Sequence, residues 1–543
     1  MAGCSNLLFT NFHINLAKYN YKPVILVVLD GFGIDTKAVN SPWQIATHPA
    51  FSEIEKFWPF TTLQASGVAV GLPWGEEGNS EVGHLTMGSG RIIYNHLPRI
   101  ISAIQDGSFF QNEALLKAIR QVQEKKSNLH LMGLFSSGSV HAYEEHVFAL
   151  LELAKKNGIQ NVYLHLFTDG RDAPLREAAE YIGEFKKKLA VQYPTAKIAS
   201  IIGREYAMDR DGNWGLIEKT YRLLTEGEGS AFQDPVFYIK EEYKNLLDDQ
   251  AIKPAFAEDS KRIRDGDAVI FWNFREDSAR ELTQSFVDKK FDKFRREYLA
   301  DLVFVTMTEY DKRLSVPAAF PHLDVKWPLA AIIAQAGLRQ LHLAETEKYA
   351  HVTYFFNGGI EKPFDNEERI LIASSEAVHY EESPEMSAEK VTEAILNNLT
   401  KYDFILANFA NADMVGHTGN FNACVKTIET LDYSIGKIIP PILDAGGILI
   451  ITADHGNIEE KIYKLTGEKR TKHSINPVPF YLISKNLKRK EAITDEEIKS
   501  AYQKVEGTLT DVAPTILELF NLPEPEEMTG KSLLDNLYAR RGI

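Results

Sequence analysis

The stretch Pro-Val-Ile-Leu-Val-Val-Leu-Asp-Gly-Phe-Gly, residues 23–33, decides the fold of this chain. Its first seven residues form a continuous apolar, β-branched run, which predicts a strand buried on both faces of a parallel sheet. Asp30 follows at the carboxyl end of that strand, where ligands collect in open α/β sheets. An Asp before a Gly is also ordinary turn chemistry, so Asp30 alone does not establish a ligand site.

Length and composition bound the class of protein. At 543 residues, with 44% hydrophobic and 25% charged residues, two or three globular domains with sizeable cores are expected. The net charge of −15 disfavours nucleic acid and anionic membranes as partners. The only cysteines are Cys4 and Cys424, which excludes a disulfide framework and favours a reducing compartment.

The first 21 residues read as a ragged extension ahead of the first strand. They lack the basic segment and long apolar run of a signal peptide. No uninterrupted apolar run approaches the roughly 20 residues that a membrane span needs. We therefore expect a cytoplasmic protein without a membrane partner.

Four further apolar runs predict strands at residues 129–135, 162–167, 198–202 and 268–272. Polar segments follow them and contain His141, Arg171, Asp172, Arg204, Arg210 and Arg275. One such Arg is easily a surface charge, but four at strand ends indicate recognition of a carboxylate or phosphate. Residues 312–327 contain Pro317 and Pro321 and read as a connection between domains.

Carboxylates and imidazoles follow the strands predicted in the second half of the chain. Asp413 and His417 are four residues apart, so one helical turn would place both on one face. Asp454 and His455 are adjacent, and they can serve one metal if the chain turns at Gly456 or two neighbouring metals if it does not.

With Asp30 and with His473, which precedes a strand at 478–483, these side chains number six. A single His of this kind is more often structural, but the shared placement predicts metal ligands. Mixed Asp/His ligation suits Zn²⁺ or Mn²⁺ better than Mg²⁺. Six ligands suffice for two ions, an arrangement that serves in-line phosphoryl displacement.

Ser80 lies in the turn-rich stretch Gly-Asn-Ser-Glu-Val-Gly-His, residues 78–84. Either Asn79 or Ser80 is a helix N-cap candidate. We expect the Ser80 hydroxyl to cap the helix, where backbone N–H groups and the helix dipole favour an anion. A serine placed there suits covalent capture of a phosphoryl group. Capping alone is the commoner role for such a residue.

Several motifs together resemble the cofactor-independent phosphoglycerate mutases of the alkaline phosphatase superfamily, from about Lys22 to the C-terminus. Those shared with the superfamily lie at residues 29–33, 78–84, 413–419 and 452–457. Those that point to the mutases lie at residues 140–141, 169–174, 203–211, 273–275, 344–359 and 384–388.

The resemblance implies two α/β domains. Residues 1–94 and 323–543 would form a doubly wound, alkaline-phosphatase-like domain with the nucleophile and metals, interrupted by a smaller substrate-binding α/β domain at 95–322. The site would lie in a cleft between them, and closure would exclude water.

By this resemblance, two divalent cations are expected, Mn²⁺ first, with Zn²⁺, Mg²⁺ and Co²⁺ as alternatives. One would be held by Asp413, His417 and His473, and the other by Asp30, Ser80, Asp454 and His455. Ser80 would be the nucleophile, and Lys348 would neutralise the transferring phosphoryl group. His141, Arg171, Asp172, Arg204 and Arg210 would hold the glycerate, with Asp172 as the proton shuttle, and Arg275 would meet the phosphate.

The implied activity is the interconversion of 3-phosphoglycerate and 2-phosphoglycerate through phospho-Ser80, without bisphosphoglycerate, in glycolysis and gluconeogenesis. The resemblance also suggests a monomer. A metal-dependent phosphatase, a phosphopentomutase and a non-catalytic binding protein on the same fold are the alternatives.

Two departures from the family pattern stand out. Ser278 occupies a position where the family usually has Arg, and Arg280 is turned by about 200° from it on a helix. Ser137 and Ser139 stand in the loop before His141, where the family commonly has Asp and Gly. The first departure puts a phosphate contact in question, and the second removes a carboxylate near the substrate.

Overall fold

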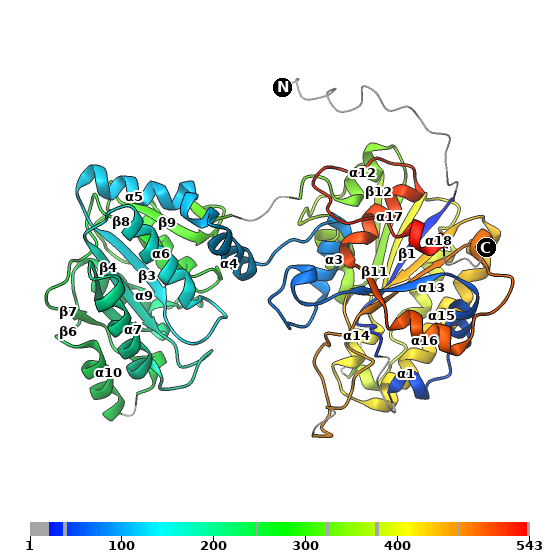
Figure 1. The fold of residues 1–543 in the computed structure, drawn as a ribbon, viewed down its shortest axis with the longest axis horizontal. Coiled ribbons are helices and arrows are strands. Elements are labelled where there is room, and N and C mark those ends of the chain that lie inside the picture. The colour runs from blue at the N-terminus through cyan, green and yellow to red at the C-terminus, as the bar shows by residue number, and fades with distance from the viewer. Residues whose placement is uncertain are drawn as a thin grey trace. The chain divides into compact units, whose positions relative to one another are not determined.

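The computed structural model describes residues 21–35, 41–245, 247–321, 325–374, 379–463 and 466–539. The expected N-terminal extension, with Cys4, lies outside these residues apart from Tyr21. The chain divides into two compact units, which Figure 1 displays with many of their elements labelled. Unit 1 comprises Met1–Tyr94 with Asp324–Ile543, and unit 2 comprises Asn95–Leu323. Both units are mixed α/β structures.

The sheet of unit 1 has eight strands among the described residues, in the order β12-β11-β13-β1-β14-β15-β2-β16. The strands are β12 (Glu367–Ile372), β11 (Gln340–Glu345), β13 (Phe404–Phe409), β1 (Val24–Leu29), β14 (Ile448–Thr452), β15 (Val478–Ile483), β2 (Phe60–Gln64) and β16 (Val505–Thr508). The first five are parallel, and β15 runs antiparallel to both of its neighbours. All six residues of β1 are fully buried, as its continuous apolar run predicts.

Helices cover both faces of this sheet (Figure 1). On one face lie α3 (Ser80–Ser89), α12 (Leu329–Gln335) and α17 (Val512–Leu519), and on the other lie α13 (Ala388–Leu396) and α15 (Phe421–Asp444). The remaining α-helices of the unit are α1 (Pro42–Ile45), α2 (Pro49–Phe57), α14 (Asn411–Gly416), α16 (Asp495–Tyr502) and α18 (Leu534–Ala539). This is the doubly wound arrangement that the sequence predicts.

The sheet of unit 2 has the order β10-β9-β8-β3-β4-β5-β7-β6 in the part of the chain that is described. Its strands are β10 (Ala318–Phe320), β9 (Val303–Thr308), β8 (Ala268–Phe271), β3 (Leu129–Leu134), β4 (Val162–Thr168), β5 (Ala196–Gly203), β7 (Ala255–Ala257) and β6 (Ser230–Phe232). The reading of residues 312–327 as a plain connection was wrong in part, because β10 pairs in parallel with β9 at the edge of the sheet.

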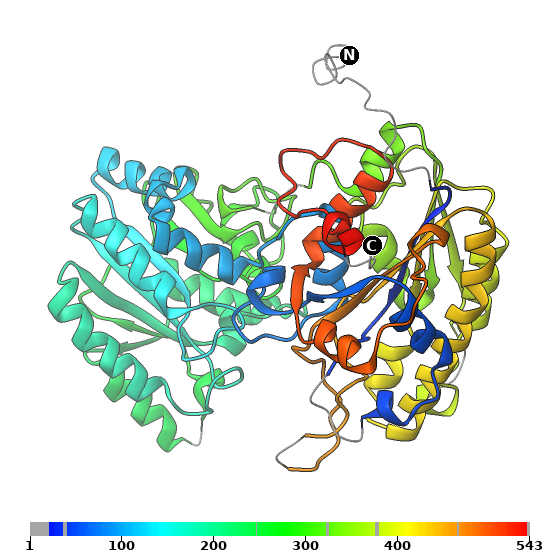
Figure 2. The ribbon, with the colours of Figure 1, turned by 45° about the vertical axis from the view of Figure 1, so that its right-hand side comes forward.

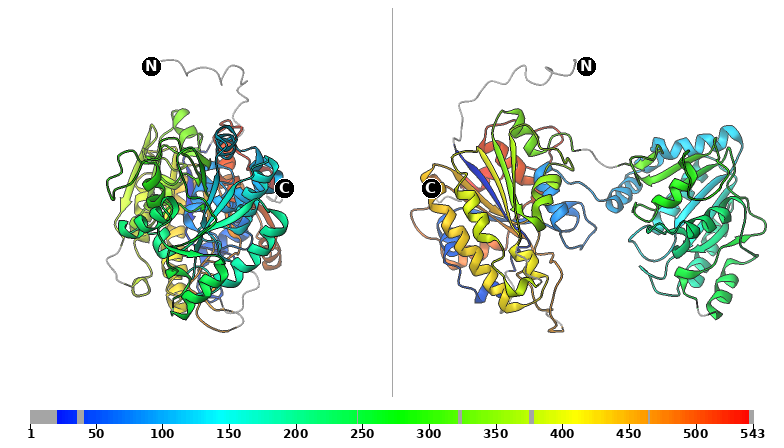
Figure 3. Two further views of the ribbon diagram at one scale, coloured as in Figure 1. Left: turned by 90° about the vertical axis from the view of Figure 1, so that its left-hand side faces the viewer. Right: turned by 180° about the vertical axis from the view of Figure 1, so that it is seen from behind.

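The helices of unit 2 are α4 (His96–Asp106), α5 (Glu113–Lys125), α6 (Glu144–Lys156), α7 (Ala178–Gln192), α8 (Arg204–Ala207), α9 (Trp214–Thr225), α10 (Pro235–Lys244) and α11 (Arg280–Val287). They pack beside the strands, as Figures 2 and 3 show from three further directions. Phe148 of α6 meets Phe185 of α7 edge to face, and Tyr221 of α9 meets Phe286 of α11. Among the described helices of the chain, none has the length and apolar content needed to cross a membrane.

Candidate active site and metal centre

Four neighbouring parallel strands of unit 1 bring the predicted side chains to one edge of the sheet. The strands are β11, β13, β1 and β14, and parallel strands end at a common edge. Lys348, Asp413, Asp30, Asp454 and His455 follow their carboxyl ends. The loop that carries His473 leads into β15, which is antiparallel and therefore starts at the same edge.

Ser80 is the first residue of α3, and the cap of that helix is Asn79. The Asn79 side chain accepts a hydrogen bond of 2.9 Å from the Val82 N–H, so the expected capping role of Ser80 was wrong. Freed from capping, Ser80 Oγ donates to Asp30 Oδ1 at 3.0 Å and accepts from Lys348 Nζ at 2.7 Å. The hydroxyl also lies 3.0 Å from His455 Nε2.

A glycine lets α3 approach the ligand loop after β14 this closely. A Cβ atom added at Gly83 would lie 2.6 Å from the Asp454 carbonyl oxygen, closer than real Cβ contacts. The helix backbone and this loop are therefore in direct contact. This contact holds Ser80 beside His455.

The Lys348 ammonium bridges two carboxylates. Its Nζ lies 2.6 Å from both Asp30 Oδ1 and Asp413 Oδ2, and the residue is 4% exposed. Burial opposes the charge, but these carboxylates and Asp454 raise the pKa of Lys348 above its ordinary value. Burial alone would raise the pKa of Asp30 and of Asp413. Lys348 makes the strongest of the opposing interactions, which together hold both pKa values well below the usual range. The lysine is therefore a fixed cation beside Ser80 Oγ.

Three donor atoms converge beside this lysine, from Asp413, His417 and His473. The two Nε2 atoms are 3.0 Å apart, and they lie 3.2 and 3.1 Å from Asp413 Oδ1. Each Nδ1 faces a backbone carbonyl, Thr471 O at 2.9 Å and Gly78 O at 2.7 Å, which places the ring proton on Nδ1 and the lone pair on Nε2. Ligands of a tetrahedral zinc site lie about 3.4 Å from one another, so this spacing fits a divalent cation.

A second group of donor atoms surrounds the Ser80 hydroxyl. His455 Nε2 lies 3.6 Å from Asp30 Oδ1 and 3.7 Å from Asp454 Oδ2. Asp454 Oδ2 is buried and has no hydrogen-bonded partner among the described residues. One atom from each of Asp30, Asp454 and His455 falls within 4.8 Å of the others, and the same holds for Asp413, His455 and His473. Two adjoining ligand groups, sharing His455, thus fit two neighbouring cations.

The charge of this centre also fits cations. Asp30, Asp413 and Asp454 supply three buried carboxylates, and Lys348 supplies one ammonium. With the imidazoles neutral, as metal ligands are, two negative charges are left where solvent has little access. Without a cation, burial opposes a charge on His455, but Asp454 and the other carboxylates raise the pKa of His455 to about 9. Buried charges are paired or coordinate metals.

The arginines of unit 2 gather at the carboxyl ends of β4, β5 and β8. Arg204 Nη1 lies 2.6 Å from both Asp169 Oδ1 and Asp172 Oδ2. Asp169 also accepts hydrogen bonds from Ser136 Oγ and from the backbone N–H groups of Arg171 and Asp172. Asp169 therefore fixes both the loop and the guanidinium.

A second carboxylate, Asp277, joins the other predicted substrate residues. Its Oδ2 accepts from Arg210 Nη1 at 2.5 Å and lies 3.1 Å from Arg275 Nη2. His141 Nδ1 lies 3.6 Å from Asp277 Oδ1, and its Nε2 lies 3.6 Å from Asp172 Oδ2. Burial, followed by the nearby Arg204, lowers the pKa of His141 to about 4. This imidazole is therefore neutral at pH 7.

Both departures from the family pattern have a structural outcome. Arg280 does not join the Asp277 cluster, because its Nε donates to Tyr310 O at 3.1 Å. Glu177 places a carboxylate on the loop before His141, where it accepts from Ser137 N and Ser137 Oγ, each at 2.7 Å. Arg171 is exposed, and no ion pair of its guanidinium is recorded among the described residues.

Sequence reasoning missed four residues that hold these clusters together. Asp169 and Asp277 orient the arginines, and His84 and Asn408 contact the metal centre. Asp169 and His84 stand inside the motifs quoted above, which is a usable signal. Asn408 is the penultimate residue of β13, which pairs with β1, the strand that precedes Asp30.

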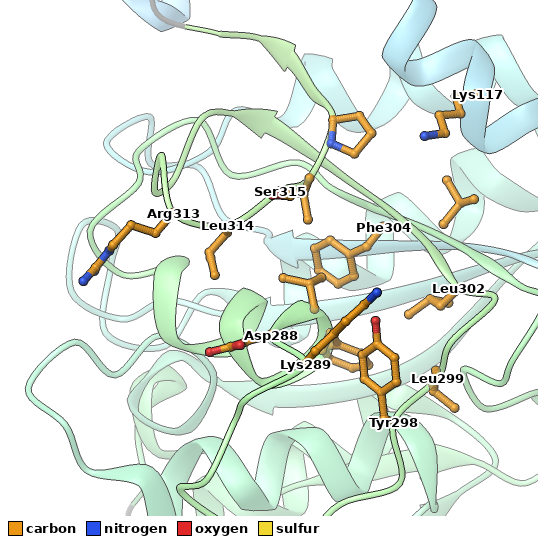
Figure 4. A pocket seen from close by; sticks show the side chains of 15 residues that line it. Lys117, Asp288, Lys289, Tyr298, Leu299, Leu302, Phe304, Arg313, Leu314 and Ser315 are labelled. Atoms are coloured by element: carbon orange, nitrogen blue, oxygen red, sulfur yellow. The ribbon is translucent and has the colours of Figure 1, made fainter.

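Unit 2 also contains a cavity of about 490 Å³ (Figure 4). Phe286, Leu302 and Phe304 line it together with Lys117, Lys289 and Tyr298. None of the predicted site residues lines it. The lining residues of β9 and β10 stand at the amino ends of those strands or just before them, opposite the edge that carries the arginines.

Comparisons with known proteins agree on one family. A family model described as the BPG-independent PGAM N-terminus matches residues 100–312. A 2,3-bisphosphoglycerate-independent phosphoglycerate mutase of Moorella thermoacetica is 46% identical over 518 residues, covering 94% of this chain and 98% of the relative. A relative of the same name from Clostridium botulinum is 45% identical over 520 residues, covering 94% and 99%. A crystal structure of Leishmania mexicana phosphoglycerate mutase at low cobalt concentration is 30% identical, with a TM-score of 0.57, and the match covers 95% and 98%.

Proposed function

The chain belongs to the 2,3-bisphosphoglycerate-independent phosphoglycerate mutases, and on that premise we propose how its two polar clusters carry out the reaction. The enzyme is an isomerase that interconverts 3-phosphoglycerate and 2-phosphoglycerate without bisphosphoglycerate and depends on divalent metal. The proposal concerns the residues, the intermediate and the ion. The observation that carries it is the Ser80 hydroxyl, which is buried and hydrogen-bonded to both Asp30 and Lys348.

Ser80 is the nucleophile. Its Oγ bonds to phosphorus as the bond from phosphorus to the glycerate oxygen breaks; the hydroxyl proton leaves along the hydrogen bond to Asp30 Oδ1, and the departing glycerate oxygen takes up a proton through Asp172. Lys348 is charged and touches the same oxygen, so it stabilises the phosphoryl oxygens during transfer and does not act as the base. The product is a phosphoserine. In the second half, the other glycerate oxygen bonds to phosphorus as the bond from phosphorus to Ser80 Oγ breaks, and Ser80 Oγ takes its proton back.

The metal ligands are assigned to two positions. Asp413, His417 and His473 hold one cation, and Asp30, Ser80, Asp454 and His455 hold the other. Divalent cations bound there would acidify the serine hydroxyl and neutralise charge on the phosphoryl group. Mixed imidazole and carboxylate ligands suit Mn²⁺ or Zn²⁺, and the family resemblance puts Mn²⁺ first, with Zn²⁺, Co²⁺ and Mg²⁺ as alternatives.

The glycerate binds to the arginine cluster of unit 2. Arg171, Arg204 and Arg210 take the carboxylate and hydroxyl oxygens together with His141, and Arg275 takes the phosphate. Asp172 is the proton shuttle between the 2- and 3-oxygens. Its carboxylate already accepts from Arg204, which holds it in place. By this assignment unit 1 carries out the transfer, and unit 2 retains the glycerate between the two transfers.

The wider setting of the enzyme belongs to the same proposal. We assign it to glycolysis and gluconeogenesis, where these two substrates are interconverted. Cytoplasmic location and the monomeric state suggested by the family resemblance stay predictions.

The test is Ser80→Ala, with Ser89→Ala in the same helix as the matched control. Each protein is assayed for mutase activity in buffer free of bisphosphate, and the phosphoenzyme is trapped from ³²P-labelled 3-phosphoglycerate and mapped. The proposal expects Ser80→Ala to lose activity and the labelled peptide while still binding Mn²⁺. Activity retained in Ser80→Ala, or label on another residue, would contradict it. A parallel assay on ribose phosphates and simple phosphomonoesters separates the phosphopentomutase and phosphatase readings.

A further inference from the structure

Two neutral side chains, His84 and Asn408, lie directly behind the proposed second metal position. Both are fully buried, and they meet although 324 residues separate them in the sequence. Asn408 Nδ2 donates to Asp30 Oδ2 at 2.9 Å and lies 3.1 Å from His84 Nε2. No role is assigned to either residue by the proposed chemistry.

The hydrogen bonds determine the tautomer of His84. The Asp30 carboxylate only accepts, so the Asn408 side chain must present its NH₂ group to it. The other hydrogen of that NH₂ group points to His84 Nε2, which must then accept. The ring proton is therefore on Nδ1, which lies 2.9 Å from Ser80 O and 3.2 Å from Asp454 Oδ2.

This pair thus joins three segments that carry ligands. Asn408 restrains Asp30 after β1, while His84 Nδ1–H bonds to the backbone carbonyl of Ser80 in α3 and lies beside the carboxylate of Asp454 after β14, in electrostatic contact without a hydrogen bond. Because Asn408 is neutral and His84 needs no second proton for these contacts, the pair restrains the carboxylates without adding positive charge. The negative charge at Asp30 and Asp454 stays available to a cation.

We propose that His84 and Asn408 are positioning residues that set the affinity of the second metal position. They hold Asp30 Oδ1, Asp454 Oδ2 and Ser80 Oγ in one arrangement before an ion binds. Hydrogen bonds behind metal ligands commonly change metal affinity by about 10- to 100-fold when they are removed. The inference rests on the ligand set proposed above.

In the experiment, Mn²⁺ is titrated into the full-length, metal-stripped protein and monitored by electron paramagnetic resonance. The titration gives the number of bound Mn²⁺ ions and the affinity of each. Asn408→Leu removes the amide, and His84→Asn keeps a donor near Ser80 O but loses the acceptor for Asn408. Both should weaken one of two Mn²⁺ ions by about 10- to 100-fold and leave the other unchanged. The value of kcat should fall at limiting Mn²⁺ and recover at high Mn²⁺, with the KM for phosphoglycerate unchanged.

His342→Asn is the matched control, since His342 is a fully buried histidine of the same unit whose hydrogen bonds among the described residues go to Val352 O and Gln340 Oε1, with Glu367 Oε1 at 3.9 Å. If it weakens one ion as much as His84→Asn does, general loosening explains the effect and the inference fails. Two ions bound normally by both test variants would also overturn it. If His84→Asn does not fold in chelator, His84→Gln takes its place in the Mn²⁺ titration. The glutamine keeps an acceptor toward Asn408.

Asp454→Asn separates this inference from the proposal beneath it. If Asp454→Asn leaves both ions bound normally, the ligand set itself is wrong. If Asp454→Asn removes one ion while His84→Asn and Asn408→Leu bind both ions like the unaltered protein, the ligand set stands and the positioning role is wrong.

Discussion

The polar clusters of the two units are built in the same way but differ in their charge balance. Each lies where neighbouring parallel strands end, one after β11, β13, β1 and β14 and the other after β3, β4, β5 and β8. In unit 1, three carboxylates face one ammonium. In unit 2, three arginines face three carboxylates, namely Arg204, Arg210 and Arg275 against Asp169, Asp172 and Asp277.

The difference teaches how one sheet edge can be adapted to a cation or to an anion. The unit 1 cluster is buried and, with its imidazoles neutral, holds an excess of negative charge, which suits bound cations. The unit 2 cluster is nearly balanced by its own acids, and the side chains of Arg210 and Arg275 are 45% and 46% exposed. It can therefore stay folded without a ligand and still exchange a carboxylate of its own for one of the substrate.

Removal of divalent cations should separate the two units most strongly. In excess EDTA we expect loss of mutase activity and a lower unfolding temperature for unit 1, with unit 2 unchanged. A ligand at 100 times its Kd stabilises a fold by about 2.7 kcal/mol, which unit 1 would lose. Differential scanning calorimetry of the full chain with and without Mn²⁺ measures this, and an equal shift of both transitions would contradict the comparison.

Replacement of Lys348 by Met tests the charge balance of unit 1 directly. We expect kcat to fall by about 10³-fold, as when a cation that stabilises a transferring phosphoryl group is removed. The metal-free protein should also lose about 3 to 5 kcal/mol, because Asp30 and Asp413 lose their buried partner. Lys348→Arg, which keeps the charge, is the control for both the mutase assay and urea unfolding. Equal losses in the two variants would show that shape, and not charge, matters there.

Within unit 2, Arg204 and Arg210 should differ when each is changed to Lys. Arg204 is 8% exposed and its Nη1 bridges two carboxylates, so Arg204→Lys should cost about 1 to 3 kcal/mol of stability. Arg210 is half-exposed, and Arg210→Lys should change stability by less than about 0.5 kcal/mol. Both should raise the KM for phosphoglycerate. Urea unfolding of the two variants measures both stability losses, and equal losses would contradict the predicted difference between Arg204 and Arg210.

The smallest expected effect is the pH dependence that His141 gives to unit 2. Its folded pKa of about 4 is below the ordinary value of 6.5, so the unfolded chain takes up the proton first. The stability from neutral His141 is therefore complete above pH 6.5 and is lost as pH falls from 6.5 to about 4. By pH 5.5 the loss is about 1 kcal/mol. His141→Gln should abolish this slope in urea unfolding, and an unchanged slope would assign it to another group.

The spacing of residues in the sequence predicted the site residues better than it predicted the contacts that hold those residues in place. Asp413 and His417, four residues apart, face one another in α14 and its cap, as one helical turn requires, and that prediction is confirmed. The other ligand residues at this edge of the sheet were predicted from their positions at strand ends alone. The contact of His84 with Asn408 could not be predicted, because its register depends on the packing of α3 against β13 across 324 residues.

The errors have local causes. Asn79 and Ser80 are both good caps, and only the backbone of α3 decides that Asn79 takes the role. Three-residue strands such as Ala318–Phe320 are too short to show a period of two, so β10 was hidden among prolines. Arg280 is the first residue of α11, and its Nε donates to Tyr310 O; position 278 lies ahead of the helix, so the expected rotation between two helical positions does not apply.

The order of strands in unit 1 also governs how the chain must be made. β1 pairs with β13 and β14, whose residues are translated about 380 and 420 positions later. At roughly 5 to 20 residues per second, the ribosome releases these partners about 20 to 80 s after β1. Unit 2 is complete in the meantime and can fold on the nascent chain. The most apolar strand of the enzyme, residues 24–29, thus waits unpaired, and it is the segment that we expect chaperones to shield during synthesis.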